Sequence, residues 1–122
     1  MTRYLRFADA LQVVTRYGFH IRDAGLLASA LARPATSVLG VDAYESLDDK
    51  AAALLESVVR NHGLIDGNKR TGWTLFVLFL WVNGYKHDFT ADEGFDLVVV
   101  VADETIELAE AARRIADHRI PR

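Results

Sequence analysis

Apolar residues recur at helical spacing along most of the chain, and six segments carry this pattern. Within each segment an apolar residue returns every three or four positions, which places these residues on one face of a helix. Glycine, proline or a capping residue stands at most of the segment ends. We therefore predict an all-α fold. The six expected helices span residues 7–17, 23–33, 50–61, 68–82, 91–101 and 107–118.

Capping residues set the expected boundaries of these helices. Gly18 is a suitable C-cap for the first helix, either Asp48 or Asp49 an N-cap for the third, and Thr90 an N-cap for the fifth. The periodic pattern is lost over residues 35–46, so we expect a loop or a short hairpin there. Irregular stretches of this length in a small domain are often functional.

The fourth helix is the most apolar, because residues 73–82 are hydrophobic on nearly every side. Such a helix is expected at the centre of a domain, surrounded by the others. The run of valines at 98–101 favours a strand by propensity, but its flanking sequence and the helical context favour a helix. No repeat, low-complexity segment or linker interrupts the chain, so we predict one compact domain spanning residues 1–122.

The composition is that of a globular protein, with 51% hydrophobic and 25% charged residues among 122. The formal net charge is −3, so the chain lacks the basic surplus of a general nucleic-acid binder. It has no cysteine, which excludes disulfides and a thiolate nucleophile. Its most apolar stretch is half of the ~20 residues that cross a bilayer, and no secretory signal opens the chain. We expect a cytoplasmic protein that does not contact a membrane.

The connection between the third and fourth helices combines a glycine with two cations at a helix start. Gly67 is followed by Asn68, Lys69 and Arg70. Backbone amides at a helix N-terminus lack partners inside the helix, and the helix dipole adds positive charge there, so the position suits an anion. Cations in a first turn disfavour the helix itself. Stability does not explain them, whereas a phosphate ligand does.

A histidine and an aspartate stand directly before this helix. His62 is of the type that titrates near neutral pH and can accept a proton, and Asp66 offers the oxygen ligands that Mg²⁺ prefers. A base, a metal ligand and a phosphate cradle within residues 62–70 predict phosphoryl or nucleotidyl transfer. The alternative is that His62 only ends one helix and Asp66 only caps the next.

The segment His62–Arg70, HGLIDGNKR, resembles the active-site motif of the Fic/Doc family. That motif is written HxFx(D/E)GNGRxxR in Fic enzymes and HxFx(D/N)(A/G)NKR in death-on-curing (Doc) toxins. RDAGLLASALARP (22–34), KAAALLESVVRNH (50–62) and FLWVNGY (79–85) resemble Doc segments in the same order and spacing. The resemblance implies an all-α fold of six helices around a buried central helix. It implies AMP transfer from ATP for the Fic branch, and phosphorylation of elongation factor Tu for the Doc branch.

The resemblance also implies roles for six residues, together with substrates and partners. The implied roles are the general base (His62), the magnesium ligand (Asp66), the anion hole (Gly67 and Asn68) and the phosphate clamps (Lys69 and Arg70). ATP and Mg²⁺ are the implied cofactors. A threonine hydroxyl of elongation factor Tu is the implied acceptor, and its phosphorylation arrests translation. A cognate Phd-like antitoxin is the implied partner, whose disordered tail folds as a helix onto the toxin.

Two substitutions favour the Doc branch. Where Fic enzymes have the second glycine of GNG, this chain has Lys69, and where they have the last arginine it has Trp73. A glycine lets the backbone approach the α- and β-phosphates, whereas a lysine fills that space with a charged side chain. We therefore predict a kinase with a reversed nucleotide that presents its γ-phosphate, and keep AMP transfer as the alternative. Leu64 replaces the phenylalanine of the motif, which leaves a catalytically weak binding module as a further alternative.

Other polar residues support weaker hypotheses. His87 and Asp88, taken with His62 and Asp117, resemble the H…HD…D pattern of helical metal phosphohydrolases, although His87 follows Asn-Gly in an expected turn. Arg33 borders the irregular segment and could reach a phosphate or a target protein, but a simple surface position is the better interpretation.

Overall fold

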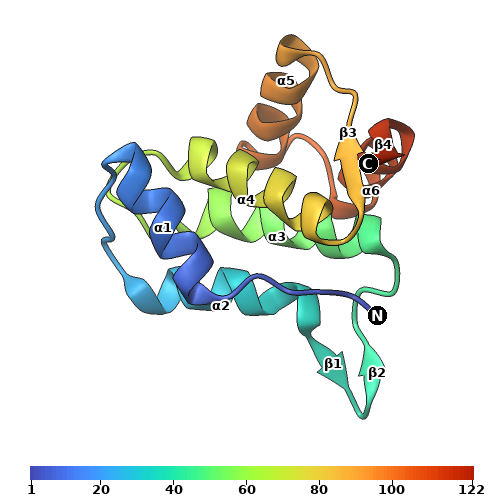
Figure 1. Ribbon diagram of the computed structural model, residues 1–122, viewed down its shortest axis with the longest axis horizontal. Coiled ribbons are helices and arrows are strands. Elements are labelled where there is room, and N and C mark those ends of the chain that lie inside the picture. The colour runs from blue at the N-terminus through green and yellow to red at the C-terminus, as the bar shows by residue number, and fades with distance from the viewer.

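Six α-helices form the body of the protein, as the hydrophobic pattern predicts (Figure 1). The computed structural model describes all 122 residues. The helices are α1 (Phe7–Tyr17), α2 (Ala24–Ala32), α3 (Leu47–Asn61), α4 (Asn68–Val82), α5 (Ala91–Ala102) and α6 (Leu108–His118). A 3₁₀ turn, η1 (Arg33–Ala35), extends α2, and four short strands make two antiparallel pairs. The strands are β1 (Ser37–Val38), β2 (Val41–Asp42), β3 (Tyr85–His87) and β4 (Arg119–Pro121).

Most of the expected caps are confirmed, but the start of α3 differs. Gly18 ends α1 in the left-handed conformation, with φ 75°, and Thr90 begins α5 in a reciprocal capping box. The N-cap of α3 is Ser46, whose hydroxyl accepts a hydrogen bond from the Asp49 amide at 3.0 Å. Asp48 and Asp49 lie inside the first turn, where the helix dipole favours a negative charge. The prediction that Asp48 or Asp49 caps this helix was wrong, because the Ser46 hydroxyl already accepts the hydrogen bond of the Asp49 amide.

The helix at the centre is α3, not the more apolar α4. Helix α3 packs against α2, α4, α5 and α6 (Figure 1), and most of its residues are buried. In contrast, the Trp81 side chain of α4 is 51% exposed, and Trp73 is only half-buried. The hydrophobicity of the sequence does not reveal which helix is central, because charged residues of α3 form hydrogen bonds and ion pairs with other parts of the fold. The Lys50 ammonium, for example, is buried and donates to Asp42 and to the carbonyl of Tyr44.

Helices α3 and α4 approach closely at a glycine. An added Cβ at Gly72 would lie 2.6 Å from Cγ1 of Val59, which is far inside van der Waals contact. The hydrophobic core around this contact draws residues from all six helices. The close approach brings the end of α3 and the start of α4 to the same side of the molecule, joined by residues 62–67.

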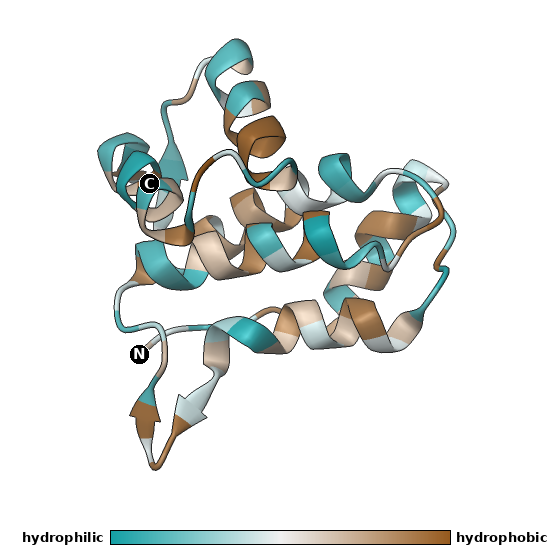
Figure 2. Ribbon diagram, turned by 180° about the vertical axis from the view of Figure 1, so that it is seen from behind, coloured by the Kyte–Doolittle hydropathy of each residue, from teal (hydrophilic) through white to brown (hydrophobic).

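The hairpin β1–β2 projects near the start of α3, at the end opposite to the connection of residues 62–67 (Figure 1). Its turn contains Leu39 and Gly40, both with positive φ, as the two-residue turns that match strand twist require. Its apolar tip stands clear of the body in Figure 2, and the Leu39 side chain is 99% exposed. A loop or hairpin over residues 35–46 is thus confirmed as a hairpin.

The pair β3–β4 was not expected from the sequence. It joins residues 85–87 to the C-terminal residues 119–121, and therefore depends on a contact between distant segments. His87 consequently lies in a strand, so its predicted place in a turn is wrong. None of the helices has the length and hydrophobicity needed to cross a membrane.

We predict that Gly72→Ala lowers the free energy of unfolding by about 1–3 kcal/mol, because the added methyl group overpacks the α3–α4 contact. Urea unfolding followed by circular dichroism measures this change. Val59→Ala introduced into the Gly72→Ala protein should recover part of the loss, since it removes the atom that the new methyl group meets. Simple addition of the two single losses would contradict this account.

Candidate active site

The connection from α3 to α4 begins at His62. This residue ends α3 as its C-cap, in the left-handed conformation with φ 53°. A positive φ is uncommon outside glycine, so the surrounding structure must hold it in place. The imidazole is exposed and makes no hydrogen bond within the chain. The His62 carbonyl accepts a hydrogen bond from Nε of Arg22 at 2.9 Å, which also places a cation at the negative end of α3.

The segment between α1 and α2 supports this connection. The amides of Arg22 and Asp23 both donate to the carbonyl of Gly63, at 2.8 and 3.0 Å, and the Ile65 amide donates to the carbonyl of His20 at 3.0 Å. The two segments therefore run antiparallel, like a fragment of a sheet. Sequence reasoning assigned no role to Arg22, and no local signal could have done so, because its partner is 40 residues away.

Asn68 fixes the middle of the connection. Its side-chain Oδ1 accepts from the Leu64 amide at 3.0 Å, and its Nδ2 donates to the Leu64 carbonyl at 3.1 Å. The Leu64 side chain is 2% exposed and belongs to the core. The leucine that replaces the motif phenylalanine is therefore firmly anchored, by its side chain and by both polar groups of its backbone.

Gly67 begins α4 in a position that only glycine fits. Its φ is 82°, and an added Cβ would overlap the ring of Phe19. Its amide donates to Oδ1 of Asp66 at 2.8 Å, so a carboxylate already occupies one N-terminal donor of the helix. The next three amides, at residues 68–70, have no partner in the chain. An anion at this position would meet these three donors.

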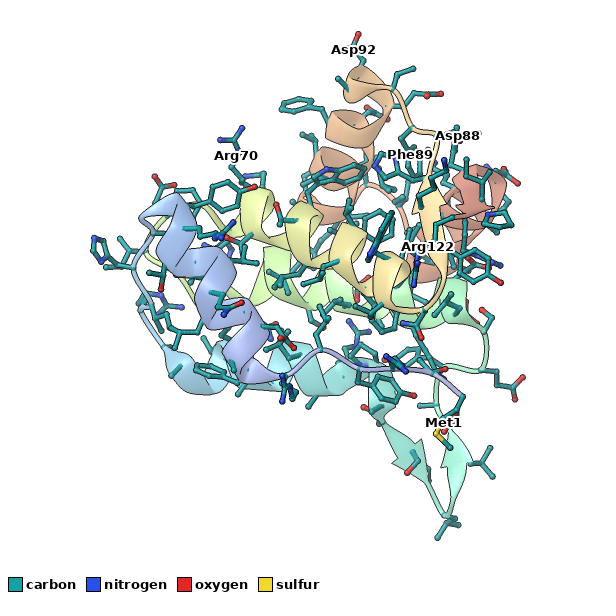
Figure 3. All side chains as sticks on the ribbon, in the orientation of Figure 1. Met1, Arg70, Asp88, Phe89, Asp92 and Arg122 are labelled. Atoms are coloured by element: carbon teal, nitrogen blue, oxygen red, sulfur yellow. The ribbon has the colours of Figure 1, made fainter.

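Lys69 and Arg70 stand in the first turn of α4 with exposed side chains. Neither forms an ion pair with a carboxylate of the chain. The Arg70 guanidinium lies 5.5 Å from the ring centre of Tyr17, and Figure 3 shows it projecting away from the body of the protein. Two unpaired cations and three unpaired amides thus share one helix end, which is unfavourable unless an anion binds there.

A cavity of about 620 Å³ opens next to these cations, between α4 and α5. Tyr17 closes one side, and its hydroxyl shares a hydrogen bond of 2.7 Å with the Thr74 hydroxyl. The remaining walls are mainly apolar and aromatic. They are formed by Trp73, His87, Phe89, Thr90, Ala91, Gly94, Phe95, Val98 and Val99.

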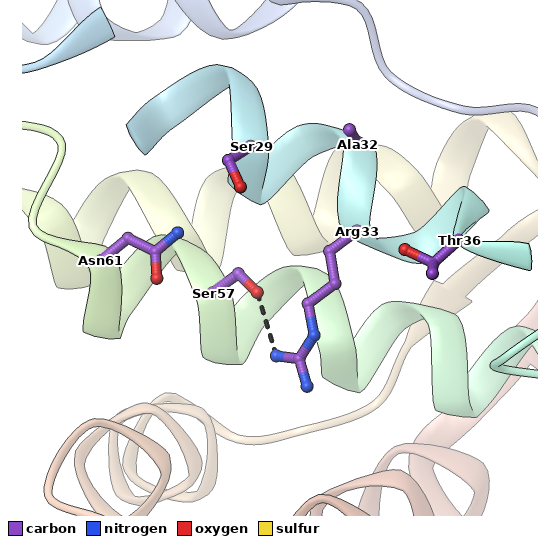
Figure 4. Close-up of a pocket in the computed structure, with 6 residues that line it drawn as sticks. All are labelled: Ser29, Ala32, Arg33, Thr36, Ser57 and Asn61. Atoms are coloured by element: carbon purple, nitrogen blue, oxygen red, sulfur yellow. Dashed lines mark hydrogen bonds between the residues drawn. The ribbon is translucent and has the colours of Figure 1, made fainter. Parts of the chain in front are cut away.

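A second hollow, of about 420 Å³, lies between α2 and α3 and is lined largely by polar residues (Figure 4). Arg33 is its only charged residue, and its guanidinium is committed to the chain itself. It donates to Glu56 at 2.8 Å, to the Ser57 hydroxyl at 2.9 Å and to the Tyr44 hydroxyl at 2.8 Å. The Arg33 side chain is partly exposed, as a surface position implies, but it ties the base of the hairpin to α3. Its contact with a phosphate or a target protein stays a prediction.

The phosphohydrolase hypothesis is also wrong. No group of three or more His, Cys, Asp or Glu side chains is arranged to hold a metal ion. Nδ1 of His87 accepts from the Phe89 amide at 3.1 Å, and burial lowers the pKa of this imidazole. Asp88 bonds to Nδ1 of His118 at 2.7 Å, and the His118 ring stacks on Phe89 with centres 4.1 Å apart. These side chains build the wall around Phe89.

We predict that Asn68→Ala loosens residues 62–67, because it removes both bonds to Leu64. Amide hydrogen exchange in this segment should accelerate at least about 10-fold, in line with the loss of ~1–2 kcal/mol of local hydrogen bonding. Asn83→Ala is the matched control, since Asn83 bonds to both backbone groups of Arg3 at the other end of α4. It should leave exchange at residues 62–67 unchanged; equal acceleration in both variants would contradict the role given to Asn68.

Comparison with known proteins agrees with this geometry. The model of the Fic/DOC family matches residues 4–80, which contain α1 to α3, the whole segment from His62 to Arg70 and all but the last two residues of α4. The chain is also 46% identical over 121 residues to Toxin Doc of Mycolicibacterium smegmatis, a match that covers 95% of this chain and 93% of that protein. On both grounds, the chain belongs to the Fic/DOC family.

Proposed function

We propose that this protein is a Doc-type toxin, a kinase that transfers the γ-phosphate of ATP to a threonine hydroxyl of elongation factor Tu. Proteins of its family use ATP as a substrate, and Fic/Doc toxins are transferases. The observation that carries the choice of a kinase is Lys69. It occupies the first turn of α4 with an exposed and unpaired ammonium, where a glycine would leave the backbone open to the nucleotide.

The anion site would receive the γ-phosphate. The free amides of residues 68–70 are held in place by the helix before the ligand arrives, and the side chains of Lys69 and Arg70 extend from the same helix end. Donors that need no reorganisation stabilise the charge that develops on the transferred group. Positioning and charge stabilisation supply most of the acceleration in phosphoryl transfer.

His62 would act as the general base. Its exposed imidazole has no partner in the chain, so a ring nitrogen is free to approach a hydroxyl of another protein. As the threonine oxygen bonds to the γ-phosphorus, its proton passes to the imidazole. The bond from this phosphorus to the bridging oxygen breaks, and ADP leaves with the electron pair.

Asp66 fits a magnesium ion. Its Oδ1 accepts from the Gly67 amide, and its Oδ2 has no partner in the chain. Mg²⁺ is commonly bound through one or two carboxylates together with substrate phosphates, so a single free oxygen next to an anion site is a suitable ligand. The ion would neutralise phosphate charge when bound.

A cognate antitoxin is the second proposed partner, because the similar protein is named a toxin. Helix α1 supports this proposal, since it leaves the Leu11 and Tyr17 side chains exposed, and Tyr17 lies beside Arg70 at the start of α4. A disordered antitoxin segment that folds as an amphipathic helix would bury such residues. Elongation factor Tu as the target places the activity in the cytoplasm.

Incubation of elongation factor Tu with this protein, ATP and Mg²⁺ should add the mass of one phosphoryl group, measured by intact mass spectrometry. His62→Ala should abolish the addition, since it removes the proposed general base. A gain of AMP would establish the alternative transfer reaction and contradict the role given to Lys69. An unmodified factor, under conditions where the protein binds ATP, would point to the alternative of a binding module.

Lys69→Gly should lower the rate of phosphoryl transfer by about 100-fold or more, the usual cost of removing one group that stabilises the transition state. The rate is measured as labelled phosphate transferred from ATP. Lys86→Ala is the matched control, because this lysine is also exposed but lies in β3. A Lys69→Gly protein that retains the full rate would contradict the proposed clamp.

A further inference from the structure

We infer that Arg22 is a positioning residue for the reaction, because it holds His62 in the backbone conformation from which the imidazole acts as the general base. The inference rests on the proposed role of His62 and deepens it. Arg22 lies in the segment between α1 and α2, outside residues 62–70. Its guanidinium is bonded to the backbone of His62 and to no carboxylate of the chain.

The left-handed backbone of His62 is not stabilised by α3 itself. Where a helix ends in a left-handed residue, the amides that follow usually donate back to carbonyls of the last turn. Gly18 shows this pattern at the end of α1. At the end of α3, in contrast, the amides of His62 and Gly63 donate to no backbone carbonyl, and that of Leu64 donates to a side chain of α4. A partner outside α3 must therefore hold His62 at its positive φ.

The Arg22 guanidinium supplies this partner. Its Nε donates to the His62 carbonyl oxygen at 2.9 Å, and its Nη2 donates to the same oxygen. Two donors of one planar group approach the oxygen from a fixed direction, which the single ammonium of a lysine does not impose. This oxygen belongs to the planar peptide group between His62 and Gly63. Holding it therefore restricts rotation about ψ at the Cα atom that carries the imidazole.

The backbone of Arg22 is itself anchored, so the guanidinium extends from a rigid position. The Arg22 and Asp23 amides both donate to the Gly63 carbonyl, at 2.8 and 3.0 Å. Asp23 is the N-cap of α2, and its side chain accepts from the Leu26 amide at 3.1 Å. An added Cβ at Gly63 would lie 3.1 Å from the backbone nitrogen of Leu27, so the connection packs directly against α2. Arg22 thus holds His62 from the start of a buried helix.

The direction of the imidazole depends on this backbone conformation. Backbone dihedral angles determine where a side chain points, and the His62 ring has no hydrogen bond that orients it instead. A general base must lie within hydrogen-bond reach of the hydroxyl that it deprotonates, and a displacement of about 1 Å can cost 100-fold in rate. The anion site at the start of α4 is built from other groups. Loss of Arg22 should therefore impair the base and leave the phosphate donors in place.

Two substitutions of Arg22 test the inference. Its side chain is exposed, so neither should unfold the protein. Arg22→Met keeps the apolar stem and removes every donor, whereas Arg22→Lys keeps the charge and one flexible donor group. Arg22→Met should lower kcat about 10- to 100-fold and leave the KM for ATP nearly unchanged, with Arg22→Lys between it and the unaltered protein. The rate is measured as labelled phosphate transferred to elongation factor Tu.

Arg16→Met is the matched control, because Arg16 is also an exposed arginine, lies in α1 and forms no ion pair. It should keep the kcat and the KM of the unaltered protein. If Arg16→Met lowers kcat as much as Arg22→Met does, the loss does not depend on the contact with His62 and the inference is overturned.

Backbone chemical shifts of His62 in NMR provide a readout that does not depend on activity, because they distinguish the left-handed conformation from the others. In Arg22→Met these shifts should move away from left-handed values, in Arg22→Lys they should move less, and in Arg16→Met they should stay unchanged. The fall in kcat should follow the change in these shifts from one variant to the next.

The outcomes separate this inference from the proposed function. If a variant of Arg22 loses rate but keeps the left-handed shifts of His62, the arginine contacts a substrate directly and the inference is overturned. Full rate in Arg22→Met, or unchanged shifts in that variant, also overturns it. If the folded, unaltered protein transfers no phosphate, the proposed function fails, and the shifts alone then decide whether Arg22 holds His62.

Discussion

The close packing of α3 against α4 is the contact on which the rest of the structure depends. Because Gly72 has no side chain, α4 packs directly against Val59 of α3, and the two helices run side by side in opposite directions. Their short connection then carries His62 at the end of one helix and Lys69 with Arg70 at the start of the next. A wider spacing would leave the connection without its core anchor, Leu64.

The start of α4 departs from the charge pattern of the other helices. The first turns of α1, α3, α5 and α6 contain an acidic residue and α2 has an aspartate as its N-cap, whereas the charged residues in the first turn of α4 are both basic. Acidic residues near a helix N-terminus are favourable by roughly 0.3–1 kcal/mol each, and cations there are unfavourable. The backbone of His62 and Gly67 is also held at positive φ. Unfavourable charge and backbone geometry within one short segment are typical of a site built for a ligand.

The C-terminal third of the chain forms most of the wall of the cavity beside the motif. The family model ends at residue 80, yet most of the cavity wall comes from residues 87–99. Strand β4 pairs with β3 and holds His87 in place, while the His118 ring covers Phe89 from the outside. Residues 118–121 therefore support the wall of the cavity, although they lie far from His62 along the chain.

The sequence alone determined the six helices, because the recurrence of apolar residues and the caps Gly18 and Thr90 are local signals. It also placed the candidate chemistry on one segment, since glycine, cations, histidine and aspartate are close together between residues 62 and 70. Both depend on interactions within a few positions, which a periodic pattern and a motif can reveal.

Only the tertiary structure decided which helix is central, which side chains hold the connection, and where a cavity opens. The burial of α3 depends on contacts with distant segments: Lys50 pairs with Asp42 of the hairpin, and Glu56 accepts a hydrogen bond from Arg33 of η1. The support from Arg22 and the pairing of β3 with β4 join residues separated by more than thirty positions. Such contacts leave no periodic trace in the sequence, because they arise from the way helices pack and not from the preferences of neighbouring residues.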